Sequence, residues 1–445
     1  MPASFPEDFL FGTATSSYQI EGSASVDGRG EGIWDRFSHQ AGNVAGEETG
    51  DVAADHYRRF SEDVALLTEV HAAAYRFSIS WPRIIPTGKG AVNSAGLDFY
   101  DRLVDELLES GIEPWPCFFH WDLPQALQDR GGWAHRDIVG RFSDFVSTVA
   151  GRIVDRTEHC LPLNEPSIFA ILGHLVGHHA PGLRDLDTCV AASHHLNLGA
   201  AAAARSLRSF RSGLRIGNAL ALNWIEPGSD SGEDRDAAAR RRAFMNDAFL
   251  QPFFEATYPE AVEHLFAPYV LEGDLEECRG QMDFIGVNYY TRLRVTSREG
   301  AKLMDSVVLP VGDDAETSEM GWEIYPNGLR DQLLELSRHF PEMPLYVTEN
   351  GVACPDKIAA GTVADSDRIA FLRRHLKACL EAIDAGADLR GYFVWSLLDN
   401  FEWAEGYEKR FGLVHVDYET QERIPKESYA WFGRLARSRL LEDGD

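Results

Sequence analysis

The sequence of 445 residues predicts an α/β protein, a single-domain (β/α)8 or TIM barrel whose extended loops form a pocket. Two patterns predict this fold. Short apolar, β-rich segments recur from one end of the chain to the other, and amphipathic segments with helical spacing separate them. Alternating strands and helices are typical of a parallel sheet, and eight strands close a barrel of this kind.

Eight segments are predicted as the barrel strands. Each is short, apolar and followed by polar or glycine-containing sequence. They are residues 9–15, 73–80, 113–120, 159–164, 214–222, 282–289, 344–348 and 390–395.

The clearest predicted helices are residues 55–70, 97–111 and 367–386, where apolar side chains recur at a spacing of three or four. Gly111 and Gly386 stand where this spacing stops, as glycine does at helix ends. No linker, repeat or long low-complexity segment interrupts the pattern. Residues 1–445 are therefore predicted to form one domain, with the extra length in loops.

The composition excludes several classes of protein. A hydrophobic share of 44% with 25% charged residues is typical of a folded globular chain. The formal net charge is −28, which disfavours nucleic acid or an anionic membrane as a partner. The acidity is interpreted as a property of the surface.

The sequence shows no recognisable targeting pattern, which favours a cytoplasmic protein. The first residues, MPASFPEDFLFG, show no signal-peptide pattern, and no apolar run reaches the length of a membrane span. The cysteines are scattered without metal-binding or disulfide spacing, which favours free thiols in a reducing compartment. They are Cys117, Cys160, Cys189, Cys278, Cys354 and Cys379.

Polar and aromatic residues follow each predicted strand, where a barrel carries its active site. The ends of parallel strands share one face, so these side chains should meet there. They are Gln19, Arg76, His120, Trp121, Asn164, Glu165, Asn223, Asn288, Tyr290, Glu349, Trp395, Glu402 and Trp403.

Two glutamates stand out within this set. Glu165 in LPLNEP and Glu349 in LYVTENG each end a β-rich run beside an asparagine. A single such glutamate is more often a solvated or salt-bridged residue. A pair across one barrel mouth is what cleavage of a glycosidic bond requires. Tryptophans in or near the strand ends suit the apolar faces of sugars, and Trp34 is also compatible with a role as core filler.

Longer motifs make the chain resemble glycoside hydrolase family 1, the β-glucosidase-like retaining enzymes, over nearly its whole length. The first and last motifs are long and specific, whereas NEP and TENG alone are short. In chain order they are FPEDFLFGTATSSYQIEG, YRFSISWPRI, HWDLPQAL, LNEP, GHHAPG, DFIGVNYYTR, MGWEIYPNGL, YVTENG and GYFVWSLLDNFEWAEGY with KRFGLVHVDY.

The resemblance implies roles for the residues around the two glutamates. Glu165 is the expected general acid/base and Glu349 the expected nucleophile. Arg76 and Tyr290 would contact Glu349 and keep it ionised, and Asn164 would bind the sugar 2-hydroxyl. The acid must be protonated at rest, so the pKa of Glu165 should be raised by burial and by the nearby negative charge.

The resemblance also implies a set of substrate-binding residues. Gln19, His120, Trp121, Glu402 and Trp403 match the hydroxyl-binding set for the non-reducing sugar. Trp395 matches its stacking floor, Trp322 the platform for the leaving group, and Asn288 a residue that orients the site.

Two variants of the family are weighed against these residues. Phospho-glycosidases carry a phosphate-binding segment where this chain has Glu402, which would repel phosphate, and thioglucosidases lack the acid glutamate. The expected substrate is therefore a small neutral O-linked β-glycoside or oligosaccharide. No cofactor and no metal are expected.

The chain departs from the family pattern at three positions. Cys160 and Pro162 replace the tryptophan and threonine upstream of NEP, and a proline in a central strand removes a ladder donor. His174 stands where the family commonly has tyrosine, close to His178 and His179. A metal site there is conceivable, but the spacing matches no standard ligand pattern and favours loop histidines.

Three functions remain open from the sequence: a retaining exo-β-glycosidase acting on glucosides, with galactosides and fucosides as further candidate substrates, a non-catalytic sugar-binding barrel, and a transglycosidase. The pair of glutamates argues against the second. Retention requires their carboxyl groups to lie about 5–5.5 Å apart. The aglycone stays open, as does the oligomeric state, for which a homo-oligomer is one alternative. Leaving-group contacts are expected from Ile168, Phe169, His178, Asn223 and Trp322.

Overall fold

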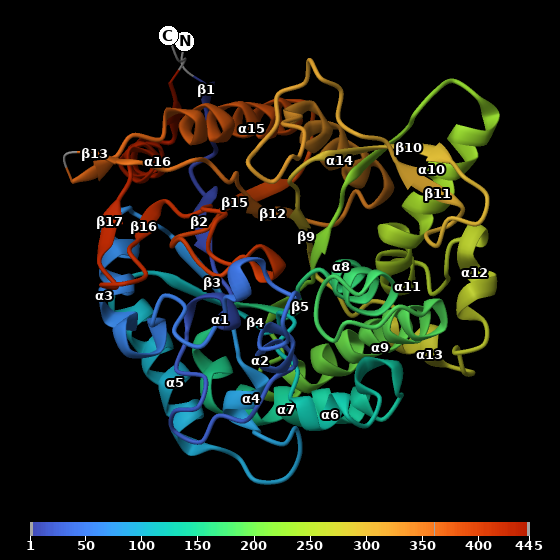
Figure 1. Cartoon of the computed structure of the whole chain (residues 1–445), viewed down its shortest axis with the longest axis horizontal. Coiled ribbons are helices and arrows are strands. Elements are labelled where there is room, and N and C mark those ends of the chain that lie inside the picture. Colours follow the sequence, from blue (N-terminus) through green and yellow to red (C-terminus); the bar gives the residue numbers. More distant parts are fainter. Residues whose placement is uncertain (1–2, 360, 443–445) are drawn as a thin grey trace.

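The computed structural model describes residues 3–359 and 361–442, and their centre is a closed ring of parallel strands surrounded by helices (Figure 1). The ends of the predicted domain, residues 1–2 and 443–445, lie outside the described residues. The barrel strands are β2 (Leu10–Ala14), β3 (Ala74–Ser78), β4 (Glu113–Phe119), β5 (His159–Leu163), β6 (Arg215–Ile216) with β7 (Ala219–Ala221), β9 (Ile285–Asn288), β12 (Leu345–Asn350) and β15 (Leu389–Trp395).

The order of these strands confirms the predicted (β/α)8 barrel. The sheet runs β6-β5-β4-β3-β2-β15-β12-β9-β7, and its two end strands are consecutive in the chain. Strands β6 and β7 are the two halves of the fifth barrel strand. The first half pairs with β5, the second pairs with β9, and a bridge between Asn164 and Ala219 joins the two edges.

The prediction of one unbroken strand over residues 214–222 was wrong in this detail. The strand is interrupted at Gly217 and Asn218, where the chain passes close to β9. A Cβ atom on Gly217 would lie 2.5 Å from the carbonyl oxygen of Phe284, so only glycine fits this approach. Asn218 then accepts a hydrogen bond from the Gly286 amide at 3.0 Å.

The predicted amphipathic segments form helices that cover the outside of the barrel. Gly111 and Gly386, with φ of 73° and 101°, follow the helices that they were expected to end. The longer helices are α3 (His56–Glu69), α5 (Ser94–Glu109), α7 (Ile138–Ile153), α9 (Leu186–Phe210), α10 (Gly232–Met245), α14 (Pro326–His339), α15 (Ser366–Asp384) and α16 (Glu427–Ser438).

Short helices lie mainly in the loops that connect these elements. They are α1 (Ser17–Ile20), α2 (Ile33–Ser38), α4 (Trp81–Ile84), α6 (Gln125–Gln128), α8 (Pro166–Ala170), α11 (Gln251–Phe254), α12 (Glu260–Phe266) and α13 (Asp274–Cys278). Among the described residues, no helix has both the length and the apolar composition that crossing a bilayer requires.

Small accessory sheets lie outside the barrel. A three-stranded sheet of β8 (Trp224–Pro227), β10 (Arg292–Ser297) and β11 (Ser306–Val308) lies beside α10 at the rim (Figure 1). The other pairs are β1 (Ala3–Ser4) with β18 (Leu440–Leu441), β13 (Ile358–Ala359) with β14 (Thr362–Val363), and β16 (Val414–Val416) with β17 (Arg423–Pro425).

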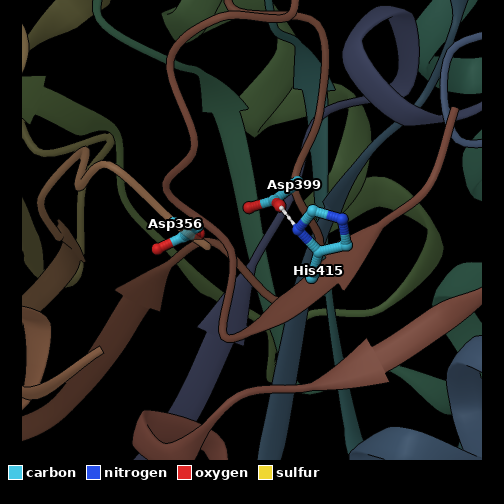
Figure 2. A group of neighbouring side chains, drawn as sticks. All are labelled: Asp356, Asp399 and His415. Carbon is cyan, nitrogen blue, oxygen red and sulfur yellow. Dashed lines mark ion pairs between the residues drawn. The ribbon is translucent and has the colours of Figure 1, made fainter. Parts of the chain in front are cut away.

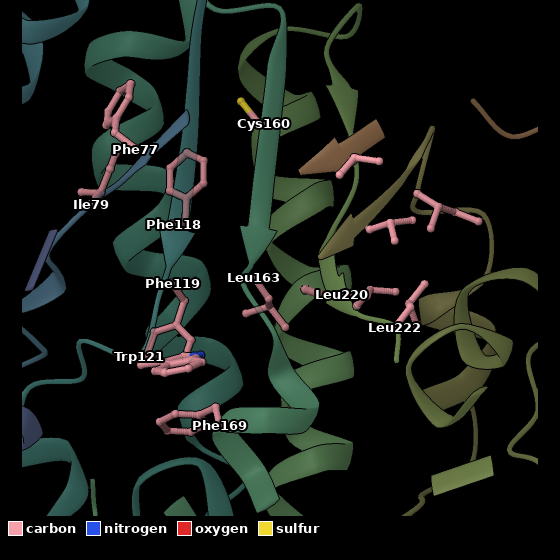
Figure 3. Packing of buried hydrophobic residues seen from close by; sticks show 14 of the residues in the cluster. Phe77, Ile79, Phe118, Phe119, Trp121, Cys160, Leu163, Phe169, Leu220 and Leu222 are labelled. Carbon is pink, nitrogen blue, oxygen red and sulfur yellow. The ribbon is translucent and has the colours of Figure 1, made fainter. Parts of the chain in front are cut away.

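Two apolar layers hold the barrel. Inside it, Trp115 stacks on His159 with ring centroids 4.0 Å apart and also contacts Tyr346 and Phe393. Outside it, side chains of the strands pack against the helices, as Figure 3 shows for Phe118 and Leu163. The inner aromatic layer fills the barrel as a packed core.

The strand that carries Pro162 recovers its hydrogen bonds immediately after the proline. The Leu163 amide donates to the side-chain oxygen of Asn218 at 3.2 Å. The Asn164 amide donates to Phe119 at 2.9 Å, and the Glu165 amide donates to Ala219 at 2.7 Å. The backbone that presents Asn164 and Glu165 is thus anchored to strands on both sides.

We predict that Asn218→Ala lowers the thermal stability of the protein. The variant leaves the buried Leu163 amide without an acceptor, which costs on the order of 1–3 kcal/mol. Differential scanning calorimetry at one fixed scan rate measures the loss as a lower Tm. An unchanged Tm would show that the Leu163 amide does not depend on this side chain.

Candidate active site

The predicted polar residues gather at the carboxyl ends of the barrel strands, around a cavity of about 440 Å³. Arg76, Asn164 and Gln19 lie behind its wall and contact the residues that form it. The predicted residues that line the cavity are His120, Trp121, Glu165, Asn288, Tyr290, Trp322, Glu349, Trp395, Glu402 and Trp403.

Glu349, near the end of β12, is buried between two hydrogen-bond donors. Arg76, in β3, donates from Nη1 to Oε1 and forms an ion pair with the carboxylate. The Tyr290 hydroxyl donates to the other oxygen, Oε2, at 2.8 Å. Because Arg76 is fully buried, its charge is weakly screened, and the ion pair holds the Glu349 carboxylate firmly in place.

A continuous chain of hydrogen bonds connects Glu349 to Glu165 through the Arg76 guanidinium and two side-chain amides. Arg76 donates from Nη2 to the Asn164 side-chain oxygen, which also accepts from Asn288 Nδ2 at 3.0 Å. The same Asn288 nitrogen donates to Glu165 Oε1 at 3.0 Å, and the Thr348 hydroxyl donates to Asn288 Oδ1 at 2.7 Å. These contacts fix the orientation of each side-chain amide, distinguishing its oxygen from its nitrogen, and hold both carboxyl groups in place.

Glu165 occupies an environment unlike that of Glu349. It lies in the left-handed backbone region, with φ of 44°, immediately before α8. Such a conformation is uncommon for a side chain of this size and recurs at functional sites. Burial, followed by the negative charge of Glu349, raises the pKa of Glu165 to about 8. The pKa of Glu165 is thus shifted upward, as expected for a proton donor.

His120 is held as a neutral imidazole. The Asn164 side-chain amide lies 2.9 Å from His120 Nε2, and because an amide nitrogen donates, Nε2 accepts. Burial, and then the positive charge of Arg76, holds the pKa of His120 well below its usual range. The proton is therefore on Nδ1, which has no hydrogen-bond partner among the described residues. That N–H is buried and unpartnered, while the imidazole ring lines the cavity.

Gln19 and Glu402 form a second polar pair on the opposite wall. Ser16 donates to Gln19 Oε1 at 2.6 Å, which leaves the Gln19 amide nitrogen to donate to Asn400 at 2.9 Å and to Glu402 at 3.4 Å. Burial, and then the charges of Glu349 and Glu165, raises the pKa of Glu402 to about 8. Glu402 can thus present a hydrogen-bonding carboxyl without a second full charge beside Glu349.

Aromatic side chains close one end of the cavity. Trp403 packs between Trp121 and Trp34, with centroid distances of 4.6 Å to each. Trp34 is fully buried behind Trp403, which fits the core-filling interpretation. Trp322 lies at the other end, 5.5 Å from Tyr290. The cavity is therefore enclosed at the Trp403 end.

The loop that carries Glu402 and Trp403 is anchored by a buried ion-pair network. Asp356, Asp399 and His415 place their ligand-type atoms close together (Figure 2). Lys426 contacts both aspartates, and lies 2.7 Å from Asp399. Arg410 pairs with Asp399 at 2.7 Å. These cations already neutralise the two carboxylates, so the cluster fits a structural ion pair better than a metal site.

The histidine-rich segment divides into two parts. His174 is fully buried, with Nδ1 3.4 Å from the Phe169 carbonyl oxygen, and does not line the cavity. Burial lowers the pKa of His174 to about 4. His178 and His179 do line it, and His178 lies 3.8 Å from Glu405 across the mouth.

Some cavity residues were missed by the sequence interpretation. Most lie on loops or helices, and Leu293 lies on the accessory strand β10, so the pattern at the barrel strand ends did not single them out. They are Leu172, His179, Met245, Thr291, Leu293, Met320, Glu405 and Phe411. Of the expected leaving-group contacts, Ile168, His178, Asn223 and Trp322 line the cavity, whereas Phe169 packs behind it.

A barrel with two buried carboxyl groups in contrasting environments at its mouth has the arrangement expected of a glycoside hydrolase. Comparison with known families agrees: the model of glycosyl hydrolase family 1 matches residues 1–440. The chain belongs to glycosyl hydrolase family 1.

Individual relatives match over almost their full length. The chain is 45% identical to β-glucosidase A of Thermotoga maritima over 99% of both chains. It is 44% identical to a 1,4-β-D-glucan glucohydrolase of Thermotoga neapolitana, again over 99% of both. A solved Thermotoga maritima family 1 glycoside hydrolase, complexed with a cyclophellitol analogue as transition-state mimic, superposes with a TM-score of 0.95 at 44% identity, covering 99% of each chain.

We predict that Tyr290→Phe lowers kcat by about 10–100-fold, because a hydrogen bond to a charged group contributes roughly 1.5–3 kcal/mol. Steady-state kinetics on an aryl β-glucoside measures the change. Tyr346→Phe is a matched control, since Tyr346 is on the same strand as Glu349 but packs against Trp115 inside the barrel. Equal losses in both variants would contradict a specific role of the Tyr290 hydroxyl.

We predict that kcat/KM falls as the pH rises through about 8, because proton donation needs the acid form of Glu165, which exists below its pKa. A pH profile of kcat/KM on an aryl glucoside measures this limb. The pKa of Glu402 is raised similarly, so Glu165→Gln assigns the limb: its residual activity on a substrate with a good leaving group should not decline there. Persistence of the decline would assign it to another group.

Proposed function

We propose that this protein is a retaining exo-β-glucosidase, with Glu349 as the nucleophile and Glu165 as the general acid/base. The contrast between the two carboxyl groups is the observation that supports the proposal most directly. Glu349 accepts from Arg76 and Tyr290, which favours a carboxylate. Burial and the charge of Glu349 raise the pKa of Glu165, which favours a carboxylic acid. One group can therefore attack while the other protonates the leaving oxygen.

In the first step, Glu349 attacks the anomeric carbon from the α face. Glu165 gives its proton to the glycosidic oxygen as the bond to the leaving group breaks, and a glycosyl ester forms on Glu349. Asn164, held by Arg76 and Asn288, presents its amide beside both carboxyl groups, where it can bind the sugar 2-hydroxyl. Rigid placement of these donors lowers the cost of reaching the transition state.

In the second step, the same acid becomes a base. Esterification removes the negative charge of Glu349, one of the two causes that raise the pKa of Glu165. The pKa of Glu165 then falls, and its carboxylate can remove a proton from water. Water attacks the anomeric carbon from the β face, the ester bond breaks, and the sugar leaves with retained configuration.

The enclosed end of the cavity supports exo cleavage of a neutral sugar. Trp403, Trp121 and Trp34 block the chain beyond the first sugar, so only a terminal residue fits. Glu402, positioned by Gln19, offers a hydrogen-bonding carboxyl group to its hydroxyls, and the His120 ring lines the same cavity. A carboxyl group at Glu402 disfavours a phosphorylated sugar. Trp395 and Trp322 provide apolar faces for the sugar and the leaving group.

We further propose a cytoplasmic role in the breakdown of glucan-derived oligosaccharides. All six cysteines are buried and unpaired, which suits a reducing compartment. One relative is named a 1,4-β-D-glucan glucohydrolase, which motivates the substrate class.

The two roles can be separated by the stereochemistry of azide rescue. In Glu165→Ala, 2,4-dinitrophenyl β-glucoside still forms the glycosyl ester, and azide, which needs no base, opens it from the β face to give β-glucosyl azide. In Glu349→Ala, azide enters from the α face and gives α-glucosyl azide. Both variants should lose at least about 10³-fold in hydrolysis without azide.

Product configuration, measured by NMR, decides the assignment. The same anomer from both variants would contradict the two roles, and an inactive wild-type protein would contradict the proposed activity altogether. The carboxyl separation of about 5–5.5 Å stays a prediction, to be measured in a crystal structure; a separation near 9 Å would indicate inversion instead.

A further inference from the structure

Strand β12 is irregular at the point where it presents Glu349. It lies between β9 and β15 in the barrel (Figure 1). From Val347 to Asn350 it advances three residues while β15 advances two. From Val347 to Glu349 it advances two residues while β9 advances one. An extra residue opposite both neighbours is a β-bulge, which changes the direction of side chains and is frequent beside active sites.

The bulge turns two consecutive side chains toward the cavity. In a regular strand, neighbouring side chains point to opposite faces. Here the Thr348 hydroxyl donates to Asn288, a residue of the cavity wall, and Glu349 lines the cavity itself. Asn350, the next residue, then faces away from the cavity and does not line it.

Asn350 is a buried amide in the layer between the barrel and its helices. Its Nδ2 donates to the carbonyl oxygen of Tyr289, and its Oδ1 accepts from the Tyr392 hydroxyl. All three residues are fully buried, and the Tyr289 ring lies 6.1 Å from that of His375 on α15. A buried amide is costly unless it is hydrogen-bonded. The Asn350 side chain thus links the strand end to β15 and to the residue after β9, where the bulge interrupts the regular pairing.

The link to Tyr289 reaches the surroundings of the Glu349 carboxylate. The Tyr289 amide donates to the Glu349 carbonyl oxygen at 2.9 Å. The next residue, Tyr290, donates from its hydroxyl to Glu349 Oε2. A displacement of the Tyr289 backbone would therefore move both the carboxylate and the hydroxyl that contacts it.

We propose that Asn350, held by Tyr392, is a positioning residue that aligns Glu349 with Tyr290 and with the anomeric carbon of the sugar. This inference rests on the proposed function, in which Glu349 is the nucleophile. Asn350 touches no reacting atom and acts through the backbones of β12 and Tyr289. Such an effect can be large, because misplacing a reacting group by about 1 Å can lower a rate by about 100-fold.

Three variants separate positioning from a contribution to stability alone. Tyr392→Phe removes only the hydroxyl that holds Asn350 and keeps the packed ring. Asn350→Ala removes the whole bridge. Tyr75→Phe is the matched control, because Tyr75 is a fully buried tyrosine of β3 whose hydroxyl is hydrogen-bonded to Thr15 at 2.6 Å. It loses an equivalent buried hydrogen bond without altering β12.

The first test measures how fast the glycosyl ester forms. With 2,4-dinitrophenyl 2-deoxy-2-fluoro-β-glucoside the fluorine slows ester hydrolysis, so the ester accumulates while dinitrophenolate is released. We expect the maximal labelling rate to fall about tenfold in Tyr392→Phe and at least as far in Asn350→Ala, while the half-saturating concentration changes less than about twofold. Tyr75→Phe should keep the wild-type rate.

The double variant adds a check on the route of the effect. Because the Tyr392 hydroxyl acts through the Asn350 amide, adding Tyr392→Phe to Asn350→Ala should cause no further loss in labelling rate. Unchanged rates in both single variants, or an equal loss in Tyr75→Phe, would overturn the inference.

A structural measurement distinguishes this inference from the proposed function. Crystal structures of the wild type and Tyr392→Phe give the distance from the Tyr290 hydroxyl to Glu349 Oε2. A change of about 0.5 Å or more, the tolerance of a catalytic arrangement, supports positioning even if mass spectrometry finds the label on a residue other than Glu349. An unmoved carboxylate overturns it even if every β-glucoside is cleaved.

Discussion

The buried guanidinium of Arg76 is the interaction on which the site depends. It donates to Glu349 on one side and to Asn164 on the other, so a single cation from β3 positions groups on β12 and after β5. It is also the positive charge that keeps His120 neutral once burial has weakened its imidazolium form. Without it, a carboxylate would lie in an apolar barrel with no counter-charge, an arrangement that is strongly unfavourable.

The distribution of charge around Arg76 explains why three carboxyl groups can share one cavity. Only Glu349 has a direct arginine partner. Glu165 is buried and Glu402 is partly buried, both without such a partner, and the resulting rise in their pKa values keeps much of each population neutral near pH 7. A second group of opposite charges, around Asp399 and Lys426, holds the loop that carries Glu402 (Figure 2). The cavity thus keeps all three carboxyl groups, and burial, rather than a cation for each, limits their total negative charge.

Much of the fold and most of the cavity could be predicted from local pattern. Each strand is followed at its carboxyl end by a residue such as His120, Glu165 or Glu349, and a barrel brings all such ends together. The break at Gly217 could not be predicted, because it follows from the close approach of Phe284, more than sixty residues away. Phe411 and Met320 were missed for the same reason: only the path of long loops brings them to the cavity.

The sequence by itself determined the barrel, the pair of glutamates and most of the side chains that line the cavity, because strand periodicity and the motifs are local properties of the chain. The tertiary structure decided the environment of each group. The fold places Arg76 between Glu349 and Asn164, and it buries Glu165 without a cation paired to it. It also brings the Asn218 side chain to the Leu163 amide, next to Pro162, as a hydrogen-bond acceptor. Burial, hydrogen-bond partners and pKa depend on atoms distant in sequence, so only the folded chain could specify them.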